Sequence, residues 1–469
     1  MVFQNNVLSG AAGSGTTVHT IDQSIRFNDD DSPYMSRTQQ AGNQTTWTIS
    51  CWVKIGNLPG NFTIWSVHTA YQSYAQIRSS TGLEFAVGNG SSGSSYHALT
   101  RLFRDPSAWY HLVMVFDSTN AASSERARIY VNGERQLDFS NTGSWSQSYS
   151  SNVNSTQTMY IGEQGTGGNH MDGYIAEFVQ IDGQALGPSS FGEFNSSGIW
   201  IPKDISGLTF GTNGCHIDGR DASDLGDDES GNGNDFSTSG LGAHDQVLDS
   251  PTNNFCTANP LDSYYFAGTF KDGNLDVTTS GATGNYTFHT TTQKIPTSGK
   301  WYMEVRAYEI GAGCYIGITQ EPTTAINVYL GQLSTTWGYY SDGRLFTNDS
   351  GSSYGNSYAN GDIIGIAVDM DNNKLYFSKN GTFQDSGDPT SGSTGTGAIS
   401  ITGGVDYFLG ASDDTGAATT SRFMWNFGQD GTFCNGVTAQ GNKDASGIGN
   451  FYYSVPSGYK ALCTKNLGS

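Results

Sequence analysis

Two carboxylates on one predicted strand are the first residues whose types could do chemistry. Hydrolysis of a glycosidic bond needs an acid and a base or nucleophile at a fixed separation, and Glu177 and Asp182 share the run GYIAEFVQID. Side chains alternate along a strand, so the odd spacing of five directs these carboxylates to opposite faces. The pattern predicts solvated strand residues and not a catalytic pair. An acid pair drawn from distant strands is the alternative.

One match to a nucleophile motif, G-x-S-x-G, occurs at Gly351-Ser352-Ser353-Tyr354-Gly355. Such a nucleophile needs a strand before it and a helix after it. Here NDS precedes the motif and NSYANGD follows it, and both are typical of loops. We interpret the match as a coincidence of a Gly/Ser-rich chain, and the sequence predicts a protein that is not an enzyme.

A group of acidic and amide side chains has the composition of a cation site. Hard cations such as Ca²⁺ take about six to eight oxygen ligands, and a Gly-rich loop can fold several inward. The spacing is not that of an EF-hand, and no Glu closes the loop. Two interpretations follow, an Asx-rich turn or a bound Ca²⁺ ion, and no other cofactor is required. The residues crowd into twelve positions: Asp224, Asp227, Asp228, Asn232, Asn234 and Asp235.

Two aromatic residues lie in the polar, charge-free loop SNTGSWSQSYSSN (140–152). Lectins stack sugar rings on aromatic faces, and exposed aromatic rings are costly unless a ligand or another subunit covers them. Trp145 and Tyr149 are therefore the candidate ligand-binding residues. The alternative is that either ring folds back as a lid on its own core, because large aromatic side chains are mostly buried.

Composition limits the class of protein that could position these groups. With 469 residues the chain is too long for one core of ordinary size. Its 62 Gly, 12% aromatic residues and only 14% charged residues are typical of a β protein. A net charge of −21 argues against binding to nucleic acid or an anionic membrane surface. We find neither an apolar run long enough to span a bilayer nor a secretory signal, so we expect no membrane insertion.

The hydrophobic pattern has a period of two almost throughout, which predicts strands. HLVMVFD (111–117) is apolar on both faces and is expected to be a central strand. RARIYVNGERQLD (126–138) and KLYFSKNGTF (374–383) are expected to be hairpins that turn at Asn-Gly, because both turn positions accept a positive φ. In WYMEVRAY (301–308) apolar residues alternate with polar and aromatic ones. The six scattered Cys predict no zinc site, and most should be small buried residues.

Four ordered motifs resemble the laminin-G-like branch of the concanavalin A-like lectin/glucanase superfamily. They are WTISCWVK (47–54), WYHLVMVFD (109–117), ARIYVNGE (127–134) and MYIGEQ…MDGYIAEFVQIDG (159–183). Further along, GKWYMEVRA (299–307), CYIGIT (314–319), GYYSDGRLF (338–346), NGDIIGIAVDMDNNKLYFSKNGTF (360–383) and MWNFG (424–428) resemble a SPRY domain. Both resemblances imply antiparallel β-sandwiches, in agreement with the period of two.

The expected architecture is all-β, with two antiparallel β-sandwich (jelly-roll) domains, concanavalin A-like and then SPRY-like, and an irregular connection. We expect an N-terminal arm that could serve as an anchor at 1–19 and a lectin domain at 20–195. An acidic, Gly/Asn-rich connecting segment at 196–262 then leads to the SPRY-like domain at 263–433. A packing tail covers 434–469.

The combination, joined by DESGNGNDF and DSPTNNF and closed by PSGYKALCTKNL, resembles virion surface proteins of tailed bacteriophages, marine ones especially. The resemblance implies a tail-fibre, spike or capsid-fibre component, assembled in the host cytoplasm and displayed on the virion surface. Its partners would be other virion proteins and a host-surface glycan or receptor, bound by a homo-oligomer, most plausibly a trimer. Two rival interpretations are a glycan depolymerase and a purely structural capsid decoration.

Overall fold

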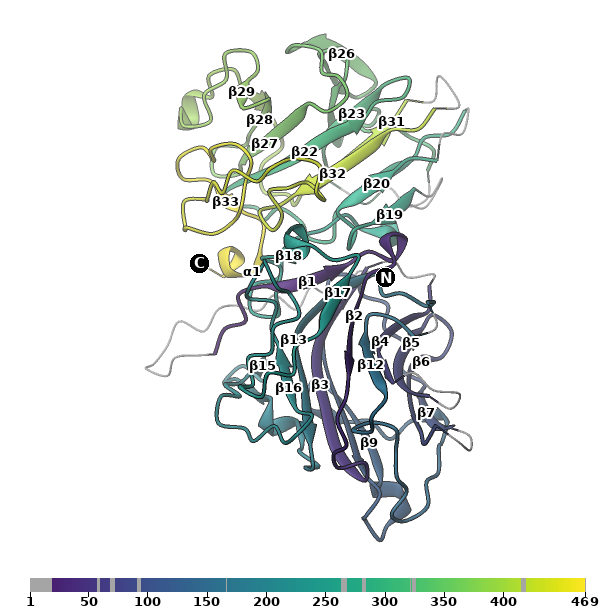
Figure 1. Cartoon of the computed structure of the whole chain (residues 1–469). Coiled ribbons are helices and arrows are strands. Elements are labelled where there is room, and N and C mark those ends of the chain that lie inside the picture. The colour runs from purple at the N-terminus through teal and green to yellow at the C-terminus, as the bar shows by residue number, and fades with distance from the viewer. Residues whose placement is uncertain are drawn as a thin grey trace. The chain divides into compact units, whose positions relative to one another are not determined.

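The computed structural model describes residues 19–56, 60–67, 72–90, 94–165, 167–262, 268–280, 284–320, 322, 326–414 and 419–468. The chain forms two compact units, one of the described residues up to Asn253 and one of those from Asn254 onward. Each unit is built from antiparallel sheets (Figure 1). The all-β, two-sandwich architecture expected from the sequence is confirmed. The expected N-terminal arm lies outside the described residues except for His19.

The first sandwich consists of two eight-stranded sheets, which we call the back sheet and the front sheet. The back sheet has the order β10 (Glu134–Arg135), β9 (Ala127–Val131), β8 (Trp109–Asp117), β3 (Thr46–Ile55), β13 (Gly173–Asp182), β1 (Ser24–Phe27) and β18 (Gln246–Val247), with β16 (Cys215–Ile217) also on β13. The front sheet has the order β11 (Phe139–Asn141), β7 (Ser94–Leu99), β6 (Gly82–Gly88), β5 (Ser73–Arg78), β4 (Phe62–Val67), β12 (Thr158–Ile161), β2 (Tyr34–Thr38) and β17 (Ser237–Ser239). A separate hairpin pairs β14 (Gly192–Phe194) with β15 (Trp200–Pro202).

Local sequence explains these strands. The apolar run 111–117 is the expected central strand, since β8 lies between β9 and β3 and is buried on both faces. The turn between β9 and β10 is Asn132-Gly133, with φ values of 50° and 81°. Asn and Gly tolerate this left-handed backbone, which matches the twist of the flanking strands. The expected hairpin is thereby confirmed.

The core of the first sandwich is formed by large side chains from both sheets. Trp47 of β3 lies edge-on to Trp65 of β4, with ring centroids 6.0 Å apart, and edge-on to Phe85 of β6 at 5.9 Å. Trp47, Trp65 and Phe85 are fully buried. This interlocked aromatic centre fixes the two sheets face to face, so the outward side of each strand is left to face solvent or covering segments.

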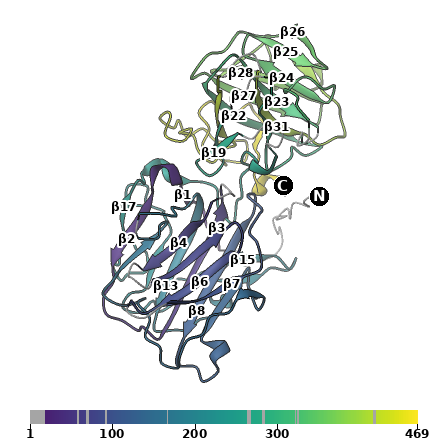
Figure 2. The same cartoon turned by 90° about the vertical axis from the view of Figure 1, so that its right-hand side faces the viewer.

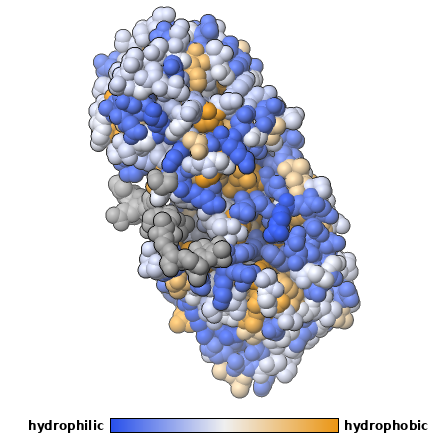
Figure 3. Space-filling view, turned by 90° about the vertical axis from the view of Figure 1, so that its left-hand side faces the viewer, coloured by the Kyte–Doolittle hydropathy of each residue, from blue (hydrophilic) through white to orange (hydrophobic). Residues whose placement is uncertain are grey.

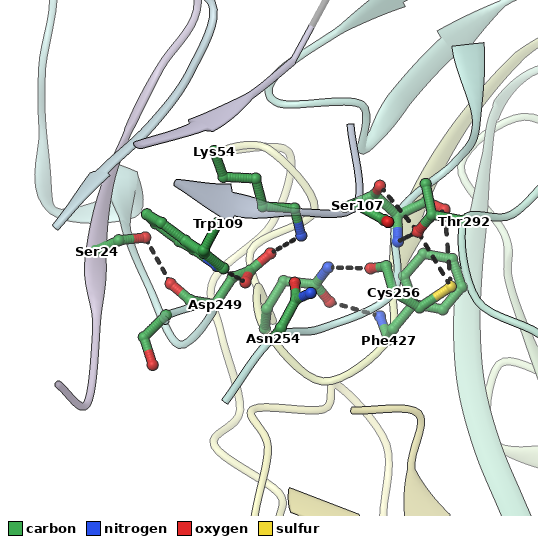
Figure 4. A network of polar contacts seen from close by, with 12 residues as sticks. Ser24, Lys54, Ser107, Trp109, Asp249, Asn254, Cys256, Thr292 and Phe427 are labelled. Atoms are coloured by element: carbon green, nitrogen blue, oxygen red, sulfur yellow. Dashed lines mark hydrogen bonds and ion pairs between the residues drawn. The ribbon is translucent and has the colours of Figure 1, made fainter. Parts of the chain in front are cut away.

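The segment expected to connect the domains instead supplies strands to the first sandwich. β16 pairs with β13, β17 with β2, and β18 with β1. Asp249, just beyond β18, is fully buried and accepts bonds from Lys54 Nζ at 2.6 Å and Trp109 Nε1 at 3.1 Å (Figure 4). The Ser24 hydroxyl donates to the Asp249 carbonyl. Burial of an ion pair that is also hydrogen-bonded fixes this segment firmly on the back sheet.

The second sandwich has a nine-stranded and a six-stranded sheet. The larger has the order β19 (Thr269–Lys271), β20 (Asp276–Thr278), β32 (Arg422–Asn426), β22 (Lys300–Glu309), β27 (Ile363–Asp369), β28 (Lys374–Lys379) and β29 (Thr382–Phe383), with β30 (Ile399–Ser400) on β28 and β33 (Lys460–Ala461) on β22. The smaller has the order β21 (Phe288–Thr290), β31 (Phe408–Asp413), β23 (Cys314–Thr319), β24 (Thr336–Tyr340), β25 (Arg344–Thr347) and β26 (Ser350–Ser353).

The predicted alternation along β22 is confirmed, because Trp301, Met303, Val305 and Ala307 all enter the core between the sheets. The hairpin between β28 and β29 turns at Asn380-Gly381, with φ values of 48° and 78°. The G-x-S-x-G match begins in β26, an edge strand whose residues are all exposed and which no helix follows. The match therefore lacks the geometry of a nucleophile turn.

The C-terminal tail packs on the outer face of the larger sheet. Glu304 of β22 is fully buried there and accepts the backbone N–H groups of Tyr452 and Tyr453, each at 2.8 Å. Asn426 Nδ2 and the Tyr302 hydroxyl donate to the same carboxyl. Burial raises the pKa of Glu304 to about 7. One buried acid thus anchors the tail to the sheet.

Helices contribute little to the described part of the chain. They are α1 (Thr464–Leu467) and the 3-10 turns Asp29–Asp31, Ser123–Glu125, Pro188–Ser190, Ala243–Asp245, Pro260–Asp262 and Gly392–Thr394. Within the described ranges no helix has the length and apolarity that crossing a membrane would require. Figure 3 shows one face of the chain, where hydrophilic residues predominate and hydrophobic residues form small separate groups.

Candidate functional site

Trp145, one of the two predicted ligand contacts, lies in the core of the first sandwich. Its ring is 3% exposed and packs edge-on against Phe116 and His97. The indole N–H donates to the Val87 carbonyl at 2.9 Å. A ligand cannot stack on a ring that is enclosed in this way. The structure therefore corrects the assignment of Trp145 as a ligand contact. Its ring instead folds back and covers the core of the first sandwich.

Tyr149 is partly buried and packs against the same core, with its ring 6.3 Å from that of Phe116. Burial raises the pKa of its hydroxyl. Its backbone carbonyl accepts a bond from the Ser118 hydroxyl. The loop that carries both aromatic residues therefore closes one end of the sandwich, and Tyr149 shows only part of its ring.

The acidic segment forms a turn closed by its own hydrogen bonds. Both oxygens of the buried Asp228 carboxylate are engaged, by the backbone N–H groups of His216, Ser230 and Asn234 and by the Ser230 hydroxyl, all at 2.8–2.9 Å. Asn234 donates to the carbonyls of Thr212 and Gly214. These bonds satisfy the groups that a cation would need.

The other members of the predicted calcium cluster serve the same turn. Asp235 accepts the backbone N–H of Asp228, Asp224 accepts that of Gly226, and Asn232 donates to two carbonyls. Asp227 is only partly buried. Within the described ranges no group of three or more His, Cys, Asp or Glu side chains could hold a metal ion. In the structure these residues form an Asx-rich turn, and the Ca²⁺ ion stays a prediction.

The two carboxylates of β13 are engaged separately. Glu177 Oε1 lies 2.8 Å from His19 Nε2. Asp182 accepts the backbone N–H groups of Asn43 and Asn213 at 2.8 and 3.1 Å. Glu177 sits at a β-bulge with φ of 48°, a left-handed conformation that is unfavourable for residues other than Gly. The pair does not share a cleft.

The outward face of the front sheet carries a cluster of tyrosines that the sequence did not single out. Tyr34, Tyr74, Tyr96 and Tyr160 are all partly exposed. Their neighbours along each strand point inward to the core, as Met35, Ala75 and Met159 do. We call this outward surface of the front sheet the tyrosine face. Figure 2 labels β2 and β7, two of the strands that carry it.

Strand register aligns three of these tyrosines in one row across the sheet. Tyr160 of β12 is opposite Ser66 of β4, and Ser66 is opposite Tyr74 of β5. Tyr74 is in turn opposite Ala86 of β6, and Ala86 is opposite Tyr96 of β7. The row therefore alternates tyrosines with small residues. Tyr34 lies beside the row, with its ring 5.9 Å from that of Tyr160.

A second row beside the tyrosines is polar. Thr63 is opposite Gln76, and Gln76 is opposite Glu84. Gln76 Nε2 donates to the Thr63 hydroxyl at 2.9 Å, while Glu84 is paired with Arg78, whose Nε lies 2.8 Å from Oε2. The charges on this part of the face are thus compensated locally.

The environment raises the pKa of two of these tyrosines, Tyr74 and Tyr160. Burial, together with the nearby Glu84 carboxylate, raises the pKa of Tyr74. Burial, together with Glu163 and Tyr34, raises the pKa of Tyr160. A neutral phenol can both donate and accept a hydrogen bond, and the electron-rich face of an aromatic ring attracts the C–H groups of a sugar ring. The tyrosine face therefore presents partly exposed rings with their phenol hydroxyls, a set suited to a carbohydrate, while Thr63 and Gln76 are fully buried and bonded to each other.

Only the register of the strands could have shown this site. Its four tyrosines come from four segments between residues 34 and 160, and each is an ordinary polar position in an alternating strand. The available signal was the alternation itself, which marks positions 74, 96 and 160 as outward. The order of the strands cannot be read from that signal.

Comparison with family models shows which domain contains the tyrosine face. Residues 28–189 match the model of the concanavalin A-like lectin/glucanases superfamily, and residues 300–398 match the SPRY domain. The chain contains a concanavalin A-like domain and a SPRY domain. The tyrosine face belongs to the concanavalin A-like domain, since β2, β5, β7 and β12 all lie inside the first match.

Curated relatives share short parts of the sequence. The Ran-binding protein 10 of Danio rerio is 31% identical over 130 residues, 26% of this chain and 21% of that protein. The Ran-binding proteins 9/10 homolog of Drosophila melanogaster is 35% identical over 95 residues, 19% of this chain and 10% of that protein. The chain thus spans about a fifth or less of the length of these relatives.

Solved structures that match the chain are more distant in sequence. The SPRY domain of human HERC1 is 15% identical, with 36% of this chain and 96% of that chain covered and a TM-score of 0.29. A heptameric SAP-like pentraxin from Limulus polyphemus is 18% identical, with 36% and 80% covered and a TM-score of 0.27.

Proposed function

We propose that the concanavalin A-like domain binds a glycan through the tyrosine face. The observation that carries this proposal is the row of Tyr160, Tyr74 and Tyr96 on the outward side of the front sheet. The partly exposed tyrosine rings and their hydroxyls provide the two kinds of contact that sugar recognition requires. The domain type supports the same function, because its superfamily is named for lectins as well as glucanases.

The proposed activity is binding without hydrolysis. Glycosidases need two carboxyl groups about 5–10 Å apart across a cleft. On the tyrosine face the carboxyl group of Glu84 is paired with Arg78, and Glu177 and Asp182 belong to the back sheet, where each has other partners. These assignments support a lectin over a depolymerase.

The setting that we propose is the surface of a bacteriophage virion, as a tail-fibre, spike or capsid-fibre component. The support is the resemblance of the two domains and of their joining and closing motifs to such proteins. Each glycan site would be weak, but copies linked in a trimer or arrayed on a particle multiply affinity by about 10² or more. The SPRY domain would then bind a protein partner, either another virion protein or a host receptor.

A glycan array tests the binding proposal directly. The full chain is expected to bind at least one polysaccharide of the host surface, and Tyr74→Ala and Tyr160→Ala are expected to weaken that binding at least tenfold. Tyr130→Ala is the matched control, because Tyr130 is a partly exposed tyrosine on β9 of the opposite sheet. If the full chain bound no glycan on the array, or if all variants bound equally, a lectin function at this face would be contradicted.

Two further measurements separate the rival functions. Reducing ends released from the bound polysaccharide, with release abolished by a Glu84→Gln substitution, would identify a depolymerase. Electron microscopy of the assembled particle tests the virion proposal, which predicts copies on the outer surface with the symmetry of a trimer or an array. A position buried between shell proteins would instead favour a structural decoration.

A further inference from the structure

Lys54 and Asp249 place an amine next to a carboxyl group inside the first sandwich. Nζ and Oδ2 lie 2.6 Å apart, and neither side chain has any exposed surface. Lys54 belongs to β3, whereas Asp249 follows β18 and is 195 positions further along the chain. Figure 4 shows the side chain of Lys54 directed at the carboxylate. A nucleophile and a carboxyl carbon that are held together in this way can react as well as attract each other.

Strand register fixes the amine in place. Lys54 is opposite Trp109 of β8 on one side and opposite Tyr174 of β13 on the other. The Tyr174 ring is fully buried, and its centroid lies 5.6 Å from Nζ. These two aromatic neighbours limit the movement of the amine and shield it from water. Groups oriented as closely as this react as if one of them were present at about 10⁵–10⁸ M.

The carboxyl group of Asp249 is held and polarised from a second side. Trp109 Nε1 donates a hydrogen bond to Oδ1 at 3.1 Å, while Oδ2 accepts from Lys54. The Ser24 hydroxyl donates to the Asp249 backbone carbonyl and so fixes the main chain there. When an amine adds to a carboxyl carbon, negative charge develops on the oxygen that stays, and a fixed N–H at that oxygen stabilises it. Trp109 provides such a donor at Oδ1.

Burial favours an amide over an ion pair at this position. Two charges removed from water carry a desolvation cost that can exceed their mutual attraction. An amide is neutral and requires only hydrogen bonds. The interior therefore shifts the balance between the two forms toward the amide, and the water that is released enters the bulk solvent. We propose that Lys54 and Asp249 condense into an isopeptide bond between Nζ and Cγ.

The condensation balances within the pair. One proton passes from the Lys54 ammonium to Asp249 Oδ2, which gives a neutral amine and a neutral carboxylic acid. The lone pair of the amine attacks Cγ, so that the Nζ–Cγ bond forms and the Cγ–Oδ2 bond breaks. A second proton of Nζ leaves with Oδ2 as water, and the third remains on the amide nitrogen. No other reactant is consumed, and the two opposite charges disappear together.

A second lysine–aspartate pair provides an internal control. Lys294 Nζ lies 2.6 Å from Asp406 Oδ2, the same distance, but these side chains are 50% and 36% exposed. Water solvates both charges there, so this pair should remain ionic. Burial and the Trp109 donor, and not the distance alone, are therefore what should make the Lys54 pair react.

Mass spectrometry of the full chain under denaturing conditions tests the proposal, because denaturation breaks an ion pair and leaves an amide intact. The mass of the intact chain should be lower than the sequence mass by one water molecule. After proteolytic digestion, the peptide that contains Lys54 should be joined to the peptide that contains Asp249. The peptides of Lys294 and Asp406 should be unlinked. A chain with the full sequence mass, or a loss of water that maps to other residues, would overturn the proposal.

Variants separate the bond from the fold. Lys54→Arg keeps the positive charge, but the guanidinium stays protonated and is a poor nucleophile, so the chain should have its full sequence mass. Lys294→Met should retain the loss of water. Trp109→Phe keeps an aromatic ring and removes the N–H donor, so the linked fraction should rise about a hundredfold more slowly after synthesis. The same loss of water in Lys54→Arg would overturn the cross-link, and an unchanged rate in Trp109→Phe would overturn the part assigned to Trp109.

Discussion

Lys54 Nζ lies 2.6 Å from Asp249 Oδ2 in the first sandwich, and both side chains are fully buried. Lys54 belongs to β3 in the middle of the back sheet, while Asp249 follows β18, almost two hundred residues later. Trp109 and Ser24 complete the bonds around Asp249. Through this pair, residues that look like a polar connection in the sequence become part of the first sandwich.

Removing one partner of this pair should destabilise the domain strongly. Asp249→Ala leaves the Lys54 ammonium without its counter-charge in the interior, which typically costs about 3–5 kcal/mol. Urea unfolding followed by tryptophan fluorescence measures the loss. Arg135→Ala, which breaks an exposed pair with Glu125, should cost about 1 kcal/mol or less. Lys54→Met, the reciprocal change, leaves the buried Asp249 carboxylate without its counter-charge and should also be destabilising. If both single variants were as stable as the wild type, a structural role for the pair would be contradicted.

The buried Glu304 should make the SPRY domain less stable as the pH rises. Burial raises its pKa in the folded state to about 7, so between about pH 4.5 and 7 the folded state holds a proton that the unfolded state has released. Stability therefore falls across that window, by up to about 1.4 kcal/mol per pH unit from this group. Melting temperatures at pH 5 and pH 7.5 should show the decrease.

The Glu304→Gln variant should lose this pH dependence because an amide does not ionise in the window. It should also be less stable at pH 5, since its NH₂ group would face backbone N–H donors of Tyr452 or Tyr453. Glu309→Gln, at an exposed position of the same strand, is the control and should keep the wild-type profile. An unchanged slope in Glu304→Gln would assign the pH dependence to another group.

The contact between His19 and Glu177 should also make the folded state less stable as the pH rises, in a window that begins at about pH 6.5. The hydrogen bond to Glu177 raises the pKa of His19 above its usual value of 6.5. The stabilisation is therefore fully present below pH 6.5 and is lost as the pH rises through the folded-state pKa. NMR titration of His19 should give a raised pKa in the wild type that returns toward 6.5 in Glu177→Gln. A value that does not move would show that the pair is not formed in solution.

Much of the fold could be predicted because its determinants are local. An apolar run identified β8 as a central strand, alternation identified the inward side of β22, and the Asn-Gly pairs identified two turns. The role of residues 215–247 could not be predicted in the same way. Their strands are only two or three residues long, too short for a period to show, and pairing with β13, β2 and β1 holds them in place.

The candidate site could not be predicted from the sequence, for a related physical reason. Trp145 was the predicted contact because it lies in a polar loop, yet a large ring in a loop can gain more free energy from burial in the core than from exposure to solvent. The tyrosines of the front sheet lie in ordinary alternating strands. Only the strand register places Tyr74 opposite Ala86 and, across Ser66 of the strand between them, in line with Tyr160. Glu177 is a further case, because a left-handed residue inside a strand leaves no trace in the hydrophobic pattern.

Trp145 and Tyr74 should therefore respond to substitution in opposite ways. Trp145→Ala empties a core position and should lower the free energy of unfolding by about 3–5 kcal/mol. Below the midpoint of unfolding it should leave glycan affinity unchanged. Tyr74→Ala removes a partly exposed ring and should reduce glycan affinity at least tenfold while the stability changes by less than about 1 kcal/mol, as is usual for surface positions. Measuring unfolding and binding on both variants forms a crossed comparison. If Trp145→Ala loses binding in the folded state while Tyr74→Ala keeps it, the loop at 140–152 and not the tyrosine face contacts the glycan.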